Sequence, residues 1–335
     1  MEKKVSLKDI AKKVGVSIAA VSYVMNGQEK EKRVGAEVVK KIREAAEELN
    51  YQPNQIARSL RTGSTKSIGL IVADIANPFF SHLARFIEDE AANYGYTVLF
   101  GSSDEDAFKS ELLIKTLFNR QVDGFIIVPT EGTINQIRGL MRRKVPMVLI
   151  DRYFPDVHTN YVILDNYQAT YDATSLLIGK GYKNICMIAY KSSLIHMNER
   201  IRGYSEALDN SGMSDNKCIK LIRFEHTQKD VDQVIHSMVV QEANSDALLF
   251  ATNALSVAGL ISAKKYNIII PKQVAIIGFD GGDCFDLFHS PLTYVEQPLE
   301  EMGKEAFRVL HDIINGSNKT SHIMLNSSLI VRNSC

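Results

Sequence analysis

The side chains able to bind or react with a ligand follow directly after predicted strands. From residue 67 onward, short apolar runs alternate with amphipathic stretches, a pattern typical of βαβ units around parallel sheets. The polar residues that end these runs include Asp74, Ser102, Thr130, Asp151, Arg152, Lys191, Asn253 and Asp280. Because ligands bind just outside the carboxyl ends of parallel strands, we predict a binding site at these residues.

Catalytic motifs are absent from the sequence. It contains no GxGxxG, GxxxxGK[ST], HExxH or GxSxG, and its eight histidines are dispersed. The four cysteines show no CxxC spacing and have no histidine at metal-ligand spacing. We therefore expect reduced thiols, no metal site, no cofactor and no enzymatic activity.

The candidate ligand residues have the chemistry of a sugar site. Asp, Asn and Arg side chains offer fixed donors and acceptors to hydroxyl groups, and an aromatic ring packs on the apolar face of a sugar. The candidates are Asn77, Phe79, Phe80, Asp151, Arg152, Arg200, Phe224, Asn253, Asp280 and Gln297, with His196 and Asn198 as weaker additions. Phe224 is either the stacking ring or an ordinary core residue.

The charges are unevenly distributed along the chain. Lys plus Arg and Asp plus Glu each total 39. Residues 1–66 hold 14 basic and 8 acidic residues, a net +6, and the remaining residues carry a net −6. Such asymmetry indicates that the N-terminal segment binds nucleic acid.

The basic segment has the pattern of a helix-turn-helix. Ser6 is a suitable N-cap for a helix over about 6–13, Gly15 supplies a turn, and Ser17 caps a second helix that runs to about Met25. A third helix is predicted from Ala36 to Leu49. In this motif the second helix enters the major groove of DNA.

Several motifs together resemble the LacI/GalR (lactose-repressor) family of bacterial transcriptional regulators. They are Leu7-Lys8-Asp9-Ile10-Ala11, Val14-Gly15-Val16-Ser17, Asn26-Gly27, Tyr51-x-Pro53-Asn54, Ala57-Arg58-Ser59-Leu60, Arg200-x-x-Gly203 and Ile277-Gly278-Phe279-Asp280. The resemblance implies a homodimer whose two heads read a palindromic operator. It also places the candidate ligand residues other than Phe224 at effector positions, whereas the Gly-Asp that usually precedes the aromatic residue of the second half is absent before Phe224. Ala254 and Gly281 stand where the family usually has aspartate, so no particular sugar is implied.

The resemblance also assigns DNA contacts. Ile18, Ala19 and Tyr23 stand where the family reads base edges, and we expect Ile18 and Ala19 to contact thymine methyl groups. Ser17, Ser22 and Asn26 are expected at phosphates. The hinge segment is expected to contribute Asn54, Ala57, Arg58 and Leu60, with Leu60 as a minor-groove wedge.

The predicted fold class is an all-α helix-turn-helix head followed by an α/β body of two Rossmann-like, periplasmic-binding-protein-like subdomains with parallel sheets. We expect the head at 1–50, a hinge helix and linker at 51–63, and an effector-binding and dimerisation domain at 64–335. Its N-subdomain is expected at about 64–162 plus 296–323, and its C-subdomain at about 163–295 plus 324–335.

The function expected from this organisation is allosteric transcriptional regulation. We predict a cytoplasmic repressor that binds a palindromic operator as a homodimer, away from any membrane, under the control of a sugar or sugar derivative. One alternative is the same architecture sensing a purine or a phosphorylated metabolite, because Arg152 and Arg200 could bind an anion. A more distant alternative is a solute-binding protein without gene regulation.

Overall fold

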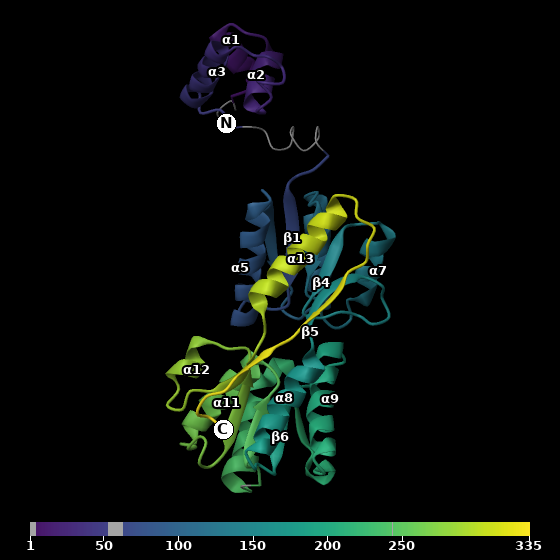
Figure 1. Ribbon diagram of the computed structural model, residues 1–335, viewed down its shortest axis with the longest axis vertical. Coiled ribbons are helices and arrows are strands. Elements are labelled where there is room, and N and C mark those ends of the chain that lie inside the picture. The colour runs from purple at the N-terminus through teal and green to yellow at the C-terminus, as the bar shows by residue number, and fades with distance from the viewer. Residues whose placement is uncertain (1–4, 53–62, 243) are drawn as a thin grey trace. The chain divides into compact units, whose positions relative to one another are not determined.

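The computed structural model describes residues 5–52, 63–242 and 244–335, and the chain divides into two compact units, Met1–Thr65 and Lys66–Cys335 (Figure 1). No helix among the described residues is long and apolar enough to cross a membrane.

The first unit is a helical head built around one small core. It contains α1 (Leu7–Val14), α2 (Ile18–Met25) and α3 (Ala36–Glu48). Ser17 Oγ accepts the N–H of Ala20 at 3.1 Å, and Gly15 ends α1 with a φ of 76°. Ile10, Val21 and Ile42 are fully buried between the helices. The three predicted helices are confirmed.

The second unit contains two separate sheets of six strands each, in the orders β11-β5-β4-β3-β1-β2 and β12-β10-β9-β8-β6-β7. Only the β10 and β12 pairing is antiparallel among the pairings of the described strands. The strands are β1 (Ser67–Val72), β2 (Thr97–Ser102), β3 (Gly124–Ile127), β4 (Met147–Ile150), β5 (Asn160–Leu164), β6 (Ile185–Tyr190), β7 (Cys218–Ile222), β8 (Ala247–Phe250), β9 (Ala275–Phe279), β10 (Thr293–Glu296), β11 (His322–Leu325) and β12 (Ser328–Ile330). This is the predicted fold class.

Helices cover the sheets in each half of the body. They are α5 (Pro78–Asn93), α6 (Ala107–Asn119), α7 (Ile134–Arg142), α8 (Asn166–Gly179), α9 (Ile195–Asn210), α10 (Thr227–Ile235), α11 (Asn253–Lys265), α12 (Asp283–Leu287) and α13 (Leu299–Ile314). Short 3₁₀ turns lie at Ser214–Asn216 and Phe224–His226, and a π-helical segment lies at His236–Gln241.

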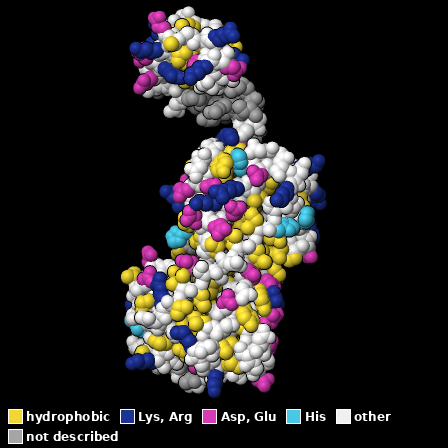
Figure 2. Space-filling view, viewed as in Figure 1, with side chains coloured by type: hydrophobic (Ala, Val, Ile, Leu, Met, Phe, Trp, Pro, Cys, Tyr) yellow, Lys and Arg dark blue, Asp and Glu magenta, His cyan; other side chains and the backbone are white. Residues whose placement is uncertain are grey.

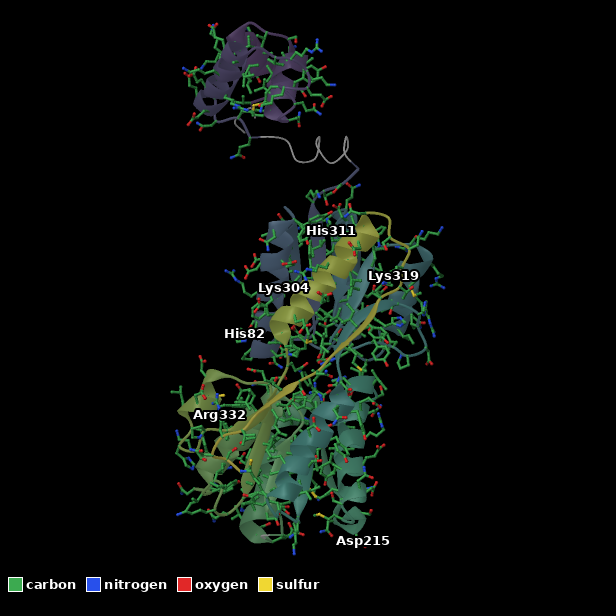
Figure 3. The ribbon with its side chains drawn as sticks, viewed as in Figure 1. His82, Asp215, Lys304, His311, Lys319 and Arg332 are labelled. Atoms are coloured by element: carbon green, nitrogen blue, oxygen red, sulfur yellow. A yellow bond between two sulfur atoms is a disulfide. The ribbon has the colours of Figure 1, made fainter. Side chains whose placement is uncertain are left out.

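The chain passes between the two halves of the body three times. It leaves the first sheet after β5, returns after β10 to form α13, and leaves again between β11 and β12. Helices α5 and α13 pack together on the first sheet, where Arg308 Nε donates to Glu90 Oε1 at 2.9 Å. Figure 3 labels His82 on α5 and Lys304 on α13. Each half is therefore assembled from segments that are distant in the sequence.

Three strands have no counterpart among the predicted apolar runs, namely β5, β7 and β10. The edge strand β7 exposes Lys220 and Leu221, so it lacks a continuous apolar run. The sequence from Leu325 to Val331 does not form one strand, because the chain there contributes to two strands in different sheets, β11 and β12.

The expectation of four reduced thiols is wrong for two cysteines. Cys186 and Cys218 are register partners on β6 and β7, and they form a disulfide with a Cα to Cα distance of 4.6 Å. Cys284 and Cys335 are free. The pairing depends on β7, the strand that the sequence pattern did not reveal.

Candidate functional site

The exposed side of α2 carries the predicted DNA contacts of the head. Ile18, at the start of the helix, is 49% exposed, and Ser17 and Ala19 beside it are also exposed. Tyr23 and Ser22 are partly buried, while Asn26 is exposed and donates to Ser22 O at 2.6 Å. Figure 2 shows Lys and Arg side chains spread over the head surface. Asn54, Ala57, Arg58 and Leu60 lie outside the described residues.

A cavity of about 610 Å³ lies at the carboxyl ends of strands from both sheets. Its lining includes nine of the ten predicted ligand residues, namely Asn77, Phe79, Phe80, Asp151, Arg152, Arg200, Phe224, Asp280 and Gln297. We call this cavity the cleft. Asn253 is absent from the lining and is buried behind it, where its Nδ2 donates to the backbone oxygen of Asp280 at 2.9 Å. Asn253 therefore supports the loop that presents Asp280.

Arg200 is held rigidly by α8 and by the second sheet. Its Nε donates to Asn166 Oδ1 at 2.7 Å and its Nη1 donates to Ala251 O at 2.5 Å. The guanidinium lies 3.7 Å from the ring centroid of Phe279. Since neither bond uses Nη2, this guanidinium can still donate hydrogen bonds to a ligand in the cleft.

Arg152 is engaged by carboxylates on two sides. Its Nη1 and Nη2 bind the two oxygens of Glu105 at 2.9 and 2.7 Å, and its Nε lies 3.3 Å from Asp151 Oδ2. Asp151 is buried, and desolvation raises the pKa of its carboxyl group against the opposing charges of Arg152 and Arg200. This bidentate pair occupies the donors that an anionic ligand would need.

The ionisation of the Asp280 carboxyl group is determined by opposing effects. It has a φ of 58°, and its Oδ1 accepts from Gln297 Nε2 at 2.8 Å. Desolvation raises the pKa of Asp280 to about 7, although Arg200 and the Gln297 hydrogen bond oppose the shift. Gln297 Oε1 is buried and has no hydrogen-bond partner in the described part of the chain. Asp280 and Gln297 together offer acceptors to ligand hydroxyl groups.

This raised pKa predicts a pH dependence of stability. Between the ordinary value of 3.8 and about 7, folded Asp280 keeps a proton that the unfolded chain has lost. The contribution of Asp280 to stability therefore falls as pH rises through that window and is constant above it. We expect Asp280→Asn to remove this component, measured as the wild-type minus variant difference in melting temperature between pH 5 and pH 8.

The comparison with the variant is needed because a second buried group, His196, changes the stability with pH in the opposite direction. Desolvation, with Arg152 and Arg200, lowers the pKa of His196 well below 6.5, so its contribution to stability is lost as pH falls below 6.5. A wild-type minus Asp280→Asn difference that does not change with pH would contradict the assignment to Asp280.

Aromatic rings line the cleft from both halves. Phe79 and Phe80 begin α5 on the first sheet, with ring centroids 4.8 Å apart. Phe224 is 41% exposed and lies 5.4 Å from the ring of Tyr190, so it is a cleft residue and not a core residue. The two aromatic groups offer apolar faces to a ligand ring.

Several cleft residues were not among the predicted ligand residues. Glu105, Glu131 and Tyr190 belong to the lining, as does His196, which was only a weaker candidate. Glu105 follows β2 and Tyr190 ends β6, so the rule that ligands bind at strand ends could have found both.

Comparisons with known proteins agree with this geometry. Residues 6–54 match the model of bacterial regulatory proteins of the lacI family, and residues 65–331 match periplasmic binding proteins and the sugar-binding domain of the LacI family. The HTH-type transcriptional repressor CytR of Escherichia coli K12 is 30% identical over 335 residues, covering 98% of this chain and 96% of CytR.

Two solved structures have the same fold. The transcriptional regulator CelR in complex with cellobiose aligns with a TM-score of 0.72 and 25% identity, over 99% of this chain and 100% of CelR. The Lac repressor dimer bound to operator and the anti-inducer ONPF aligns with a TM-score of 0.87 and 20% identity, over 99% of each chain.

A helix-turn-helix head followed by a two-sheet ligand-binding body defines a DNA-binding transcriptional regulator. The chain belongs to the LacI family of bacterial regulatory proteins. Among its relatives, CytR is a transcriptional repressor and RegA of Clostridium acetobutylicum, 31% identical over 335 residues, is a transcriptional regulator.

Proposed function

We propose that this protein is a repressor that binds a palindromic operator as a homodimer and responds to an uncharged sugar or sugar derivative in the cleft. The effector assignment is carried by one observation, the pairing of the cleft arginines with carboxylates. Arg152 is bound by Glu105 and Asp151, and Arg200 is attracted by the carboxyl groups of Asp280 and Asp151.

The charge of the cleft supports an uncharged effector. The lining contains eight acidic residues, Asp74, Asp104, Glu105, Asp106, Glu131, Asp151, Glu225 and Asp280, and four basic ones, Arg152, Lys191, Arg200 and Arg223. A phosphorylated metabolite would therefore meet net negative charge, which disfavours the anion-sensing alternative. Hydroxyl groups can instead donate to Asp280 and Gln297 and accept from Arg200.

An exposed apolar edge of the body supports the homodimer. Strands β2 and β7 are edge strands of their respective sheets, and residues that follow both line the cleft. Phe100 on β2, Leu112 on α6 and Leu221 on β7 are exposed, and Phe108 on α6 is 77% exposed. A second copy of the chain would cover these side chains and supply the second head that a two-fold operator requires.

The mechanism follows from the position of the cleft between the two sheets. A ligand that contacts both sheets favours one relative orientation of the two halves of the body. In the dimer, that change would alter the spacing of the two heads. Coupling of this kind is typically about 1–3 kcal/mol, or roughly a 5- to 150-fold change in operator affinity.

The proposal is tested by measuring operator binding and effector binding separately. Fluorescence anisotropy with a palindromic operator should show tight binding that weakens steeply with salt. Thermal shifts against neutral sugars, sugar phosphates and nucleobases should identify a neutral sugar, and that sugar should change operator affinity. Absence of salt-sensitive DNA binding would reject the operator proposal, and stabilisation by a nucleobase alone would reject the sugar.

A substitution at the first residue of α2 tests the predicted base contact. We expect Ile18→Gln to change the preferred operator bases, because an apolar contact with a thymine methyl group is replaced by an amide that can pair with adenine. The relevant measurement is selection of bound sequences from a randomised operator library. An unchanged preference would show that residue 18 does not read bases. Ile18 is exposed, so folding of the head should be unaffected.

A further inference from the structure

Glu131 connects the two halves of the body across the cleft. It follows β3 of the first sheet, whereas Ser192 and Ser193 follow β6 of the second. Glu131 Oε1 accepts from Ser192 Oγ at 2.8 Å and from Ser193 Oγ at 3.0 Å. It also accepts the backbone N–H of Ser193. A single carboxylate oxygen thus holds the segment that leads into α9.

The first turn of α9 is a place where a negative charge is stabilised. The N-cap residue Leu194 provides no side-chain acceptor for the exposed N–H groups, and the helix dipole is positive at this end. Leu194, His196 and Met197 from this turn line the cleft. Helix N-termini with these properties commonly bind phosphate groups.

His196 gives an independent sign that this corner is built for a ligand. It is only 6% exposed, and its Nδ1 has no hydrogen-bond partner among the described residues. Besides its desolvation, the charges of Arg152 and Arg200 act to keep it neutral. The imidazole is therefore neutral at neutral pH, and the charged groups acting on it are the guanidinium groups of Arg152 and Arg200.

Glu131 supplies a negative charge at this corner. Although desolvation opposes ionisation, hydrogen bonds from the backbone and hydroxyl groups of Ser193 and Ser192 hold the pKa of Glu131 below 4.5. The side chain is therefore a carboxylate at neutral pH. Arg152 attracts it as well.

Building on the proposed effector site, we propose that Glu131 is a built-in anion whose negative charge neutralises the start of α9 and repels phosphate groups from it. It restricts the cleft to uncharged ligands by excluding phosphate esters. The same contact ties the first sheet to the second. Glu131 is thus a specificity-determining residue for the effector.

The test is Glu131→Gln in the full chain, with inorganic phosphate as the probe. Glutamine keeps the size of the side chain and one acceptor oxygen but removes the charge. Because the positive corner then lacks its counter-charge, we expect phosphate to bind at least about tenfold more tightly than to the wild type. Binding is measured by ³¹P NMR titration at constant ionic strength, and circular dichroism verifies the fold.

Glu225→Gln is the matched control, because it removes one negative charge from the same cleft at an exposed residue of the 3₁₀ turn Phe224–His226. We expect it to change phosphate affinity by much less than Glu131→Gln. An equal increase of phosphate affinity in the two variants, or no increase in Glu131→Gln, would overturn the assignment to Glu131.

A second arm separates this inference from the proposed function. Glucose and ribose are compared with glucose 6-phosphate and ribose 5-phosphate by thermal shift on the wild type. A phosphate ester that stabilises the wild type more than its parent sugar would overturn the exclusion of anions. If neither parent sugar binds but Glu131→Gln binds phosphate more tightly than the wild type does, the sugar proposal loses support while the role of Glu131 stands.

Discussion

Arg200→Ala should abolish effector binding and lower the stability of the body by about 3 kcal/mol, because it leaves two buried acceptors without their donor. Arg200 is 2% exposed, and its loss leaves Asn166 Oδ1 and Ala251 O without their donor. It also removes the positive charge that opposes the desolvation of Asp280, which should raise the pKa of that carboxyl group further. Thermal denaturation and effector-induced shifts measure the two effects.

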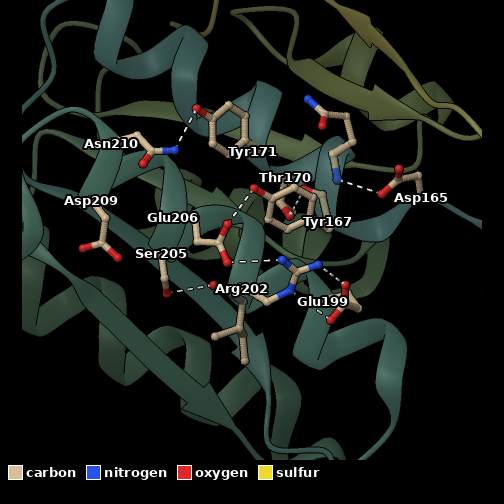
Figure 4. A network of polar contacts seen from close by, with 12 residues as sticks. Asp165, Tyr167, Thr170, Tyr171, Glu199, Arg202, Ser205, Glu206, Asp209 and Asn210 are labelled. Atoms are coloured by element: carbon tan, nitrogen blue, oxygen red, sulfur yellow. Dashed lines mark hydrogen bonds and ion pairs between the residues drawn. The ribbon is translucent and has the colours of Figure 1, made fainter. Parts of the chain in front are cut away.

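Arg202→Ala is the matched control, two residues further along α9. Arg202 is 47% exposed and forms ion pairs with Glu199 and Glu206, while its guanidinium lies 3.9 Å from the ring centroid of Tyr167 (Figure 4). Exposed pairs contribute little, so we expect a loss below about 1 kcal/mol and an unchanged effector shift. Similar losses in the two variants would show that Arg200 has no special role in the cleft.

Gly203→Ala should destabilise the body by about 3 kcal/mol, at the upper end of the usual cost of overpacking. An added Cβ would lie 2.2 Å from Tyr167 O and 2.6 Å from Thr170 Oγ1 on the neighbouring helix α8. The backbone oxygen of Tyr167 cannot move without shifting α8, which also carries Asn166, the partner of Arg200. We therefore expect weaker effector binding together with a lower melting temperature.

Gly139→Ala provides the opposite control. Gly139 lies within α7, and an added Cβ there would meet no atom within 4 Å. Because alanine favours the helix over glycine by about 0.5–1 kcal/mol, we expect slight stabilisation. A Gly203→Ala protein as stable as the wild type would show that α8 and α9 can separate without cost.

The helices of the head and the position of Arg200 in the cleft could be predicted from the sequence, because their signals are local. Ser6, Gly15 and Ser17 fix helix ends by short-range contacts, and the Arg200-x-x-Gly203 spacing places the arginine over the site and the glycine against α8. Both kinds of signal lie within a few neighbouring residues. The resemblance to the LacI family rested on the same motifs.

The remaining features depend on contacts between distant segments. Glu131 meets Ser192 across 61 positions of sequence, and Cys186 meets Cys218 only because β7 pairs with β6. Asn253 was expected in the cleft, but its amide is used to support the Asp280 backbone. No pattern along the chain distinguishes a ligand contact from a supporting contact of this kind.

The three passages of the chain between the sheets have a consequence for how the body comes apart. Because α13 returns to the first sheet after the whole second sheet except β12 has been laid down, neither half is complete until the chain is nearly finished. A single proteolytic cut at one passage leaves the halves joined by the other two. The body should therefore fold as one unit, and its two halves should stay connected after a single cut.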